Sequence, residues 1–129
     1  MPKKIKITTP KKSIDAELTD SKTASLILKA LPIEAKVNRW GDEIYFKIPV
    51  DSLLDDTAKE VVEMGEIGYW PTGNAFCIFF GPTPISSGND IVPASAVNIV
   101  GKVLGDLNAL KEAFDGDKIR LDILDKIEK

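Results

Sequence analysis

Short segments in which apolar and polar residues alternate constrain this chain more than any other feature of its sequence. In residues 3–8, Ile5 and Ile7 share one face while lysines occupy the other, and residues 13–18 repeat the pattern. A period of two is typical of a half-buried β-strand. Because residues 9–12 between the two segments contain Pro10, we expect a turn there and a β-hairpin at the start of the chain.

The same period predicts further strands along the chain. In residues 44–50, the apolar residues from Ile44 to Val50 fall on one face, and Gly41 in the turn before them predicts a second hairpin. Residues 75–80 are apolar on both faces, which favours a central position in the sheet. In residues 118–124, we expect Ile119, Leu121 and Ile123 to point inward. The remaining predicted strands are residues 36–40, 66–70 and 96–103.

Two segments have the spacing of short helices. Asp20 and Ser21 offer N-cap oxygens to a helix that ends at Pro32, and Asp106 offers one to a helix within residues 105–114. Residues 51–63 are predicted to form a loop with one helical turn, and residues 81–89 a long exposed loop. We therefore predict a mainly β single domain over residues 1–129, a closed eight-stranded antiparallel barrel with two short capping helices.

Composition excludes several classes of function. The chain has no His and one Cys, Cys77, which excludes an imidazole base, a His-ligated metal and an intramolecular disulfide. The 17 basic and 20 acidic residues give a net charge of −3, which does not favour binding to nucleic acid or anionic lipid. We expect no cofactor and no metal.

The order of residues also bears on location. The first residues lack the apolar stretch of a secretory signal, and no apolar run is long enough to span a membrane, so we expect a cytoplasmic protein. Gln and His are absent while Ile, Lys and Glu are abundant, a composition associated with organisms that live at high temperature. A melting temperature in the mesophilic range would contradict that hypothesis.

Polar side chains offer few candidates for catalysis. The neighbouring carboxylates Asp55 and Asp56, and the pair Glu60 and Glu63, lie in a polar stretch that is typical of solvated surface. Residues 115–117 have the composition of a turn. Cys77 lies among Phe and Ile residues, and we predict an unreactive buried thiol.

Aromatic residues near strand ends give the strongest signal for a binding site. Such side chains line grooves that hold peptides or small organic ligands, and they plug barrel ends equally often. Arg39 is a candidate to clamp a ligand carboxylate or carbonyl, or else to pair with Asp42 or Glu43 at the surface. The predicted groove residues are Arg39, Trp40, Tyr45, Tyr69, Trp70 and Phe79.

Four blocks of the sequence carry a recognisable pattern: residues 37–46 (VNRWGDEIYF), 65–71 (GEIGYWP), 75–84 (AFCIFFGPTP) and 93–101 (PASAVNIVG). Together they resemble a family of small prokaryotic cyclophilin-like proteins of unknown function. The resemblance implies the eight-stranded barrel of the cyclophilin peptidyl-prolyl isomerases. It does not imply their activity, because fold and function separate freely. The isomerases carry an Arg in a Phe-His-Arg context with Gln and His in a proline pocket, whereas this chain has neither Gln nor His, and Arg39 lies between Asn38 and Trp40.

These observations favour a barrel that binds a small molecule or peptide in a surface groove. Two alternatives stay open at this point. One is a divergent, weak peptidyl-prolyl isomerase that uses Arg39, and the other is an interaction subunit of a larger complex that docks a protein partner through the aromatic residues.

Overall fold

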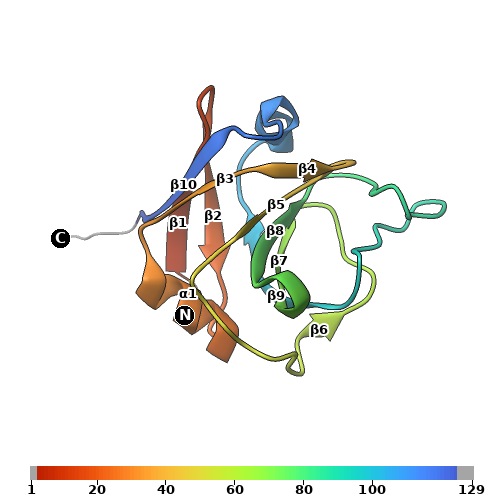
Figure 1. The fold of residues 1–129 in the computed structure, drawn as a ribbon, viewed down its shortest axis with the longest axis horizontal. Helices are drawn as coiled ribbons and strands as arrows, with labels where there is room; N and C mark the ends of the chain where they lie inside the picture. The colour runs from red at the N-terminus through yellow and green to blue at the C-terminus, as the bar shows by residue number, and fades with distance from the viewer. Residues whose placement is uncertain (1–2, 125–129) are drawn as a thin grey trace.

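A computed structural model describes residues 3–124. Within that range the chain forms ten strands, one α-helix and two short 3₁₀-helices (Figure 1). In chain order they are β1 (Lys3–Thr8), β2 (Ser13–Leu18), α1 (Lys22–Ala30), β3 (Ile33–Lys36), β4 (Asn38–Trp40), β5 (Glu43–Lys47), β6 (Ala58–Lys59), β7 (Glu66–Trp70), η1 (Pro71–Gly73), β8 (Ala75–Phe79), β9 (Val97–Val103), η2 (Leu107–Glu112) and β10 (Lys118–Ile123).

The strands form one antiparallel sheet that curls into a barrel. Its order is β3-β10-β1-β2-β9-β7-β8-β5-β4, with β6 paired to β9. The two ends of this order, β3 and β4, are separated by Val37 alone, whose backbone N–H donates to the Asp117 carbonyl at 2.8 Å. If β3 and β4 are counted as one interrupted strand, the chain itself closes a ring of eight, which confirms the predicted barrel.

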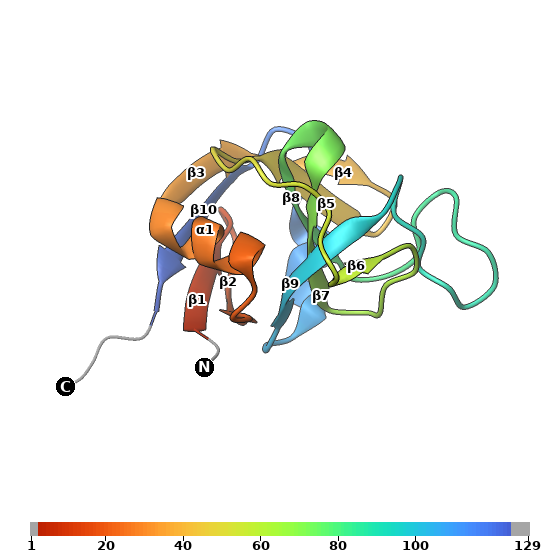
Figure 2. The same cartoon turned by 90° about the horizontal axis from the view of Figure 1, so that it is seen from below.

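Two helices cover the ends of the barrel, as predicted (Figures 1 and 2). The Ser21 hydroxyl accepts a hydrogen bond from the Ala24 N–H and caps α1, whose Ala24 and Ile27 are buried in the barrel core. The Asp106 side chain caps η2 in the same way, and Leu110 of η2 enters that core from the other end. Both helices are held mainly by this burial, since isolated helices of their length are marginal in water.

The barrel wall buries apolar residues on both faces where β5, β7, β8 and β9 lie side by side. On β8, Phe76 and Ile78 point into the barrel, whereas Ala75, Cys77 and Phe79 belong to a second buried cluster on the outer face. The central position predicted for this strand is confirmed, because β8 lies between β7 and β5. The other members of the outer cluster are Val62, Ile91 and Val97.

The connection between β8 and β9 covers this outer cluster. Ile91 pairs with Val62 in an isolated bridge, and its side chain is buried. Thr83 is also buried, and its hydroxyl hydrogen-bonds the Val92 carbonyl and the Ser86 hydroxyl. The loop predicted to be exposed at residues 81–89 is exposed over most of its length and extends away from the barrel (Figure 1), whereas Thr83 and Ile91 of the connection are buried.

The structure corrects the sequence predictions at two places. Residues 51–63 contain no helical turn; they include the two-residue strand β6, which a sequence pattern is too short to reveal. Ile123 was expected to point inward with Ile119 and Leu121, but it is 48% exposed because it lies at the last residue of β10.

Asn98 of β9 joins three elements inside the barrel. Its side-chain oxygen accepts from the Asp55 N–H at 2.8 Å, and its amide donates to Thr23 of α1 and to the Leu53 carbonyl. It is fully buried, and both the oxygen and the nitrogen of its side-chain amide are hydrogen-bonded.

None of the helices in the described residues is long and apolar enough to cross a membrane.

Candidate functional site

The hairpin of β4 and β5 sends neighbouring side chains to opposite faces of the barrel wall. Arg39 is paired with Ile44, which points into the barrel, whereas Trp40 is paired with Glu43 on the outer face. Gly41 in the turn has φ +63°, a conformation that glycine adopts without strain, as the sequence predicted for this hairpin.

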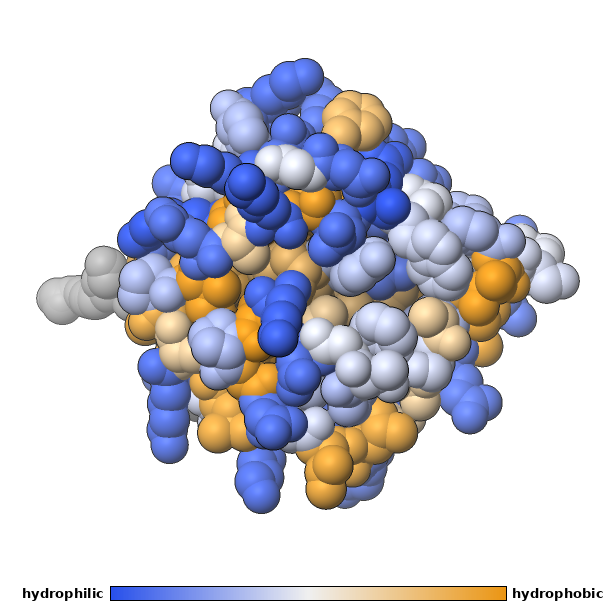
Figure 3. Space-filling model, viewed as in Figure 1, coloured by the Kyte–Doolittle hydropathy of each residue, from blue (hydrophilic) through white to orange (hydrophobic). Residues whose placement is uncertain are grey.

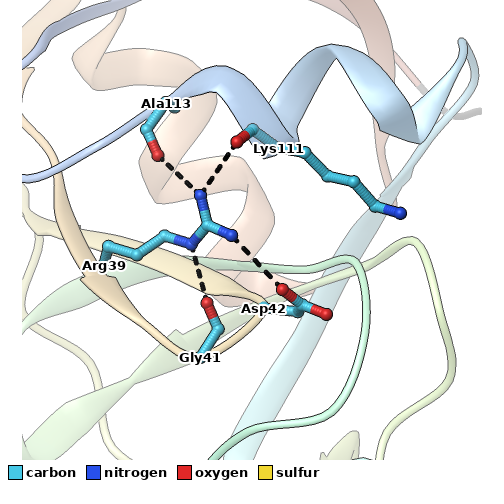
Figure 4. A network of polar contacts seen from close by, with 5 residues as sticks. All are labelled: Arg39, Gly41, Asp42, Lys111 and Ala113. Carbon is cyan, nitrogen blue, oxygen red and sulfur yellow. Dashed lines mark hydrogen bonds and ion pairs between the residues drawn. The ribbon is translucent and has the colours of Figure 1, made fainter.

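Arg39 is held by the protein itself (Figure 4). Its guanidinium donates to the Gly41 carbonyl at 2.7 Å and to the Lys111 and Ala113 carbonyls at 3.0 Å. It also pairs with Asp42 at 3.3 Å. Because the carbonyls at the end of η2 lack helical partners, a cation is favourable there. The predicted pairing with Asp42 is confirmed, and Arg39 is a structural clamp between β4 and η2.

Two further predicted groove residues are fully buried. Tyr69 points into the barrel, where its hydroxyl donates to the Val50 carbonyl at 2.6 Å and accepts from the Asn74 amide at 2.9 Å. Phe79 lies on the outer face, within the second cluster. Neither residue lines a pocket with the other predicted aromatic side chains.

The remaining three predicted residues, Trp40, Tyr45 and Trp70, meet at one pocket on the outer face. They come from β4, β5 and β7, and each is partly exposed. The rings of Tyr45 and Trp70 lie edge to face, with centroids 6.4 Å apart. The Trp70 indole N–H donates to the Ser95 hydroxyl at 2.6 Å, which ties the aromatic wall to the β8–β9 connection. The pocket encloses about 100 Å³, and its other lining residues are Glu43, Cys77, Pro93, Ala94 and Val97.

Glu43 is the one charged side chain among these lining residues. The sequence predicts Glu43 as an alternative surface partner of Arg39, and this prediction is wrong, because Glu43 is 4% exposed and lies on the opposite face of the barrel wall. Its Oε1 is the only buried side-chain nitrogen or oxygen atom within residues 3–124 that lacks a hydrogen-bond partner. Burial raises the pKa of the carboxyl to about 7, and the neighbouring Cys77 thiol, whose Sγ lies 3.9 Å from the Ala75 carbonyl oxygen, partly opposes that rise.

Cys77 is buried, as predicted, but not in the barrel interior. Its side chain lies on the outer face of β8 and lines the pocket beside Glu43. Burial raises the pKa of the Cys77 thiol well above its ordinary value, and the nearby carboxyl raises it further. The residue is therefore a thiol at neutral pH, which disfavours a nucleophilic role.

Of the other acidic candidates, Asp56, Glu60 and Glu63 are exposed, and Asp55, Asp115 and Asp117 serve local structure. Asp55 accepts hydrogen bonds from the backbone and hydroxyl of Thr57 and from Thr23, and these contacts outweigh its slight burial and lower its pKa. Asp117 accepts a hydrogen bond from the Phe114 N–H, in keeping with the predicted turn, whereas Asp115 accepts one from the backbone N–H of Arg39 in β4. Among residues 3–124, no three His, Cys, Asp or Glu side chains gather as a metal site requires.

A larger hollow of about 540 Å³ lies between the β1–β2 turn and the strands β3 and β10. Two of its four charged lining residues are paired with each other, since Arg120 and Glu34 lie 2.6 Å apart, and the other two, Lys36 and Lys118, lie opposite each other on β3 and β10. The smaller pocket is the better candidate because it contains a buried polar atom with an unused acceptor.

Comparison with protein families matches the cyclophilin-like family over residues 3–122. The chain belongs to the cyclophilin-like family. A similar solved structure is the solution structure of a hypothetical protein from Archaeoglobus fulgidus, with 38% identity, a TM-score of 0.80 and coverage of 95% of each chain. A search of curated proteins finds no significant match. The family resemblance and the barrel predicted from the sequence are thus confirmed.

Glu43 is the functional candidate that sequence reasoning missed in this cyclophilin-like chain. Its alternation with Tyr45 on β5 placed it on the outer face, so the signal was present. What the sequence did not reveal is that the β8–β9 connection, through Pro93 and Ala94, closes over that face.

Proposed function

We propose that this cyclophilin-like protein binds a small molecule, or one side chain of a peptide, in the outer-face pocket formed by Trp40, Tyr45 and Trp70. The observation that carries the proposal is the convergence of these three rings on a buried carboxyl with an unused acceptor. Small-molecule sites combine apolar walls with a few polar groups in this way. At about 100 Å³ the pocket is well below the volume of a drug-sized site, so it takes one group of a ligand.

Intrinsic fluorescence tests this proposal directly, because the chain has two tryptophans and both line the pocket. A screen of small molecules and short peptides is expected to find ligands that change the emission in a saturable way. Trp70→Ala and Tyr45→Ala are expected to weaken those ligands by at least about tenfold. Leu53→Ala is the matched control, since Leu53 is 83% exposed and outside the pocket. Affinities left unchanged by both aromatic substitutions would refute the proposal.

The geometry favours binding over prolyl isomerisation. The isomerase alternative relied on Arg39, whose guanidinium already makes four hydrogen bonds, to three internal carbonyls and to Asp42. In a protease-coupled assay with a proline peptide, we expect no turnover above background. Turnover that disappears in Arg39→Ala, while that variant stays folded, would establish the isomerase instead.

The interaction-subunit alternative finds less support. On the face shown in Figure 3, hydrophobic side chains lie at several separate places with hydrophilic residues between them. The exposed large hydrophobic residues include Leu53, Met64, Ile85 and Phe114, which belong to different loops. A protein partner and a cytoplasmic location stay predictions from the sequence.

A further inference from the structure

We infer that the group bound in the outer-face pocket is a protonated amine, an alkylammonium ion, recognised by the Glu43 carboxylate and the faces of Trp40, Tyr45 and Trp70. This inference rests on the proposed function and names the chemical class of its ligand. It starts from the one buried polar atom, Glu43 Oε1, that the described part of the chain leaves without a partner.

The charge of the lining residues selects a cation. Glu43 is the sole charged side chain among the eight residues that line the pocket, and the nearest arginine, Arg39, points to the other face of the wall. An anion would meet a buried carboxylate with no compensating cation. A neutral hydrogen-bond donor would satisfy Oε1 but leave the buried charge uncompensated, whereas an ammonium group does both.

The aromatic walls select the same group. The electron-rich faces of Trp and Tyr attract cations, most strongly where water is excluded. Three such rings line the pocket together with the carboxyl, and the bond from Trp70 to Ser95 fixes one of them in place. The volume of about 100 Å³ holds more than one water molecule but not a whole cofactor, which fits an ammonium group with a short alkyl chain.

The pH dependence follows from the groups that face Glu43. β5 contributes Tyr45 and β8 contributes Cys77, which is a thiol at neutral pH; the lining residues of β4, β7, β9 and the β8–β9 connection carry no titratable group. Nearby Asp42 is paired with Arg39. Because burial sets the pKa of Glu43 at about 7, the carboxylate is largely present at pH 8 and only about one part in a hundred at pH 5.

The test uses tryptophan fluorescence with n-butylammonium and its neutral analogue n-butanol at pH 8 and pH 5. We expect saturable binding of butylammonium at pH 8, binding about 100-fold weaker at pH 5, and at least tenfold weaker binding of butanol. An alkylammonium stays protonated throughout this range, so the pH effect reports on the protein. Glu43→Gln is expected to lose at least tenfold in affinity for butylammonium, while Glu60→Gln, at an exposed glutamate outside the pocket, retains it.

A peptide with acetylated and amidated ends and one central lysine distinguishes two sources of the alkylammonium group, a lysine side chain and a free amine. Tighter binding of the peptide than of butylammonium assigns the pocket to a lysine side chain, and the reverse order assigns it to a free amine; both results support the inference. Butanol that binds as tightly as butylammonium, or Glu43→Gln with unchanged affinity and a normal circular dichroism spectrum, would overturn it. Other ligands found by the fluorescence screen would in that case leave the proposed function intact, and a screen that finds none would remove both.

Discussion

Replacing Glu43 with Gln is predicted to stabilise the protein at high pH and to have little effect at low pH. The folded state raises the pKa of this carboxyl from 4.5 to about 7 because burial penalises the charged form. Below pH 4.5 the carboxyl is neutral in the folded and the unfolded chain. Between pH 4.5 and 7 the folded chain binds the additional proton, so the free energy of unfolding falls as pH rises through this window and then levels off.

The size of the effect follows from the pKa shift. A rise from 4.5 to about 7, at about 1.4 kcal/mol per pKa unit, amounts to a loss of about 3 kcal/mol for the wild type above pH 7. The side chain is almost fully buried, so this energy needs no large reduction for solvent screening. Gln is uncharged at every pH and avoids the loss, which corresponds to a melting temperature higher by on the order of 10 °C at pH 8.

Urea denaturation of the wild type and Glu43→Gln, followed by circular dichroism from pH 4.5 to 8.5, measures this difference. The difference in unfolding free energy is expected to grow with pH up to about pH 7 and to stay constant above it. Glu60→Gln serves as the control, because it makes the same chemical change at an exposed position. If the difference in unfolding free energy between Glu43→Gln and the wild type did not vary with pH, or if the variant became less stable than the wild type as pH rises, the buried carboxylate would be compensated and the reasoning refuted.

Two other substitutions probe the framework around the site. Arg39→Ala is expected to lower the unfolding free energy by about 2–4 kcal/mol, because it removes hydrogen bonds to three carbonyls and to Asp42 and contacts with the Phe80 and Phe114 rings. The variant Arg39→Lys is not expected to recover this stability, and neither variant should change ligand affinity in the pocket. A weakened affinity with unchanged stability would instead place Arg39 in the binding site. Asn98→Ala is expected to lower the unfolding free energy by about 2–3 kcal/mol in the same denaturation assay, since it leaves the Asp55 N–H and the Leu53 carbonyl without this partner. A decrease below about 0.5 kcal/mol would contradict the role of Asn98 in joining α1, β9 and residues 51–57.

Local sequence signals were enough to predict the barrel. The alternation around Ile5 and Ile7 specifies a strand whatever surrounds it, because successive side chains of a strand point to opposite faces. Ser21 and Asp106 cap their helices through bonds to residues two or three positions away, and Gly41 permits its turn through its own backbone. β6 escaped prediction because it spans two residues and exists only through its pairing with β9.

The candidate site depended on information that a local pattern does not contain. The alternation of side chains along β5 predicts that Glu43 and Tyr45 share a face of the strand. Which face of the strand is covered depends on where the β8–β9 connection packs, and that connection is remote in sequence. The same uncertainty applied to the six aromatic and basic candidates, of which Trp40, Tyr45 and Trp70 converge while Arg39 and Tyr69 point inward. Short-range periodicity and backbone chemistry, which are visible along the chain, predict the longer strands, the helix caps and the closed barrel. The burial of Glu43 in an aromatic pocket arises only on folding, because it depends on contacts between segments far apart in the chain.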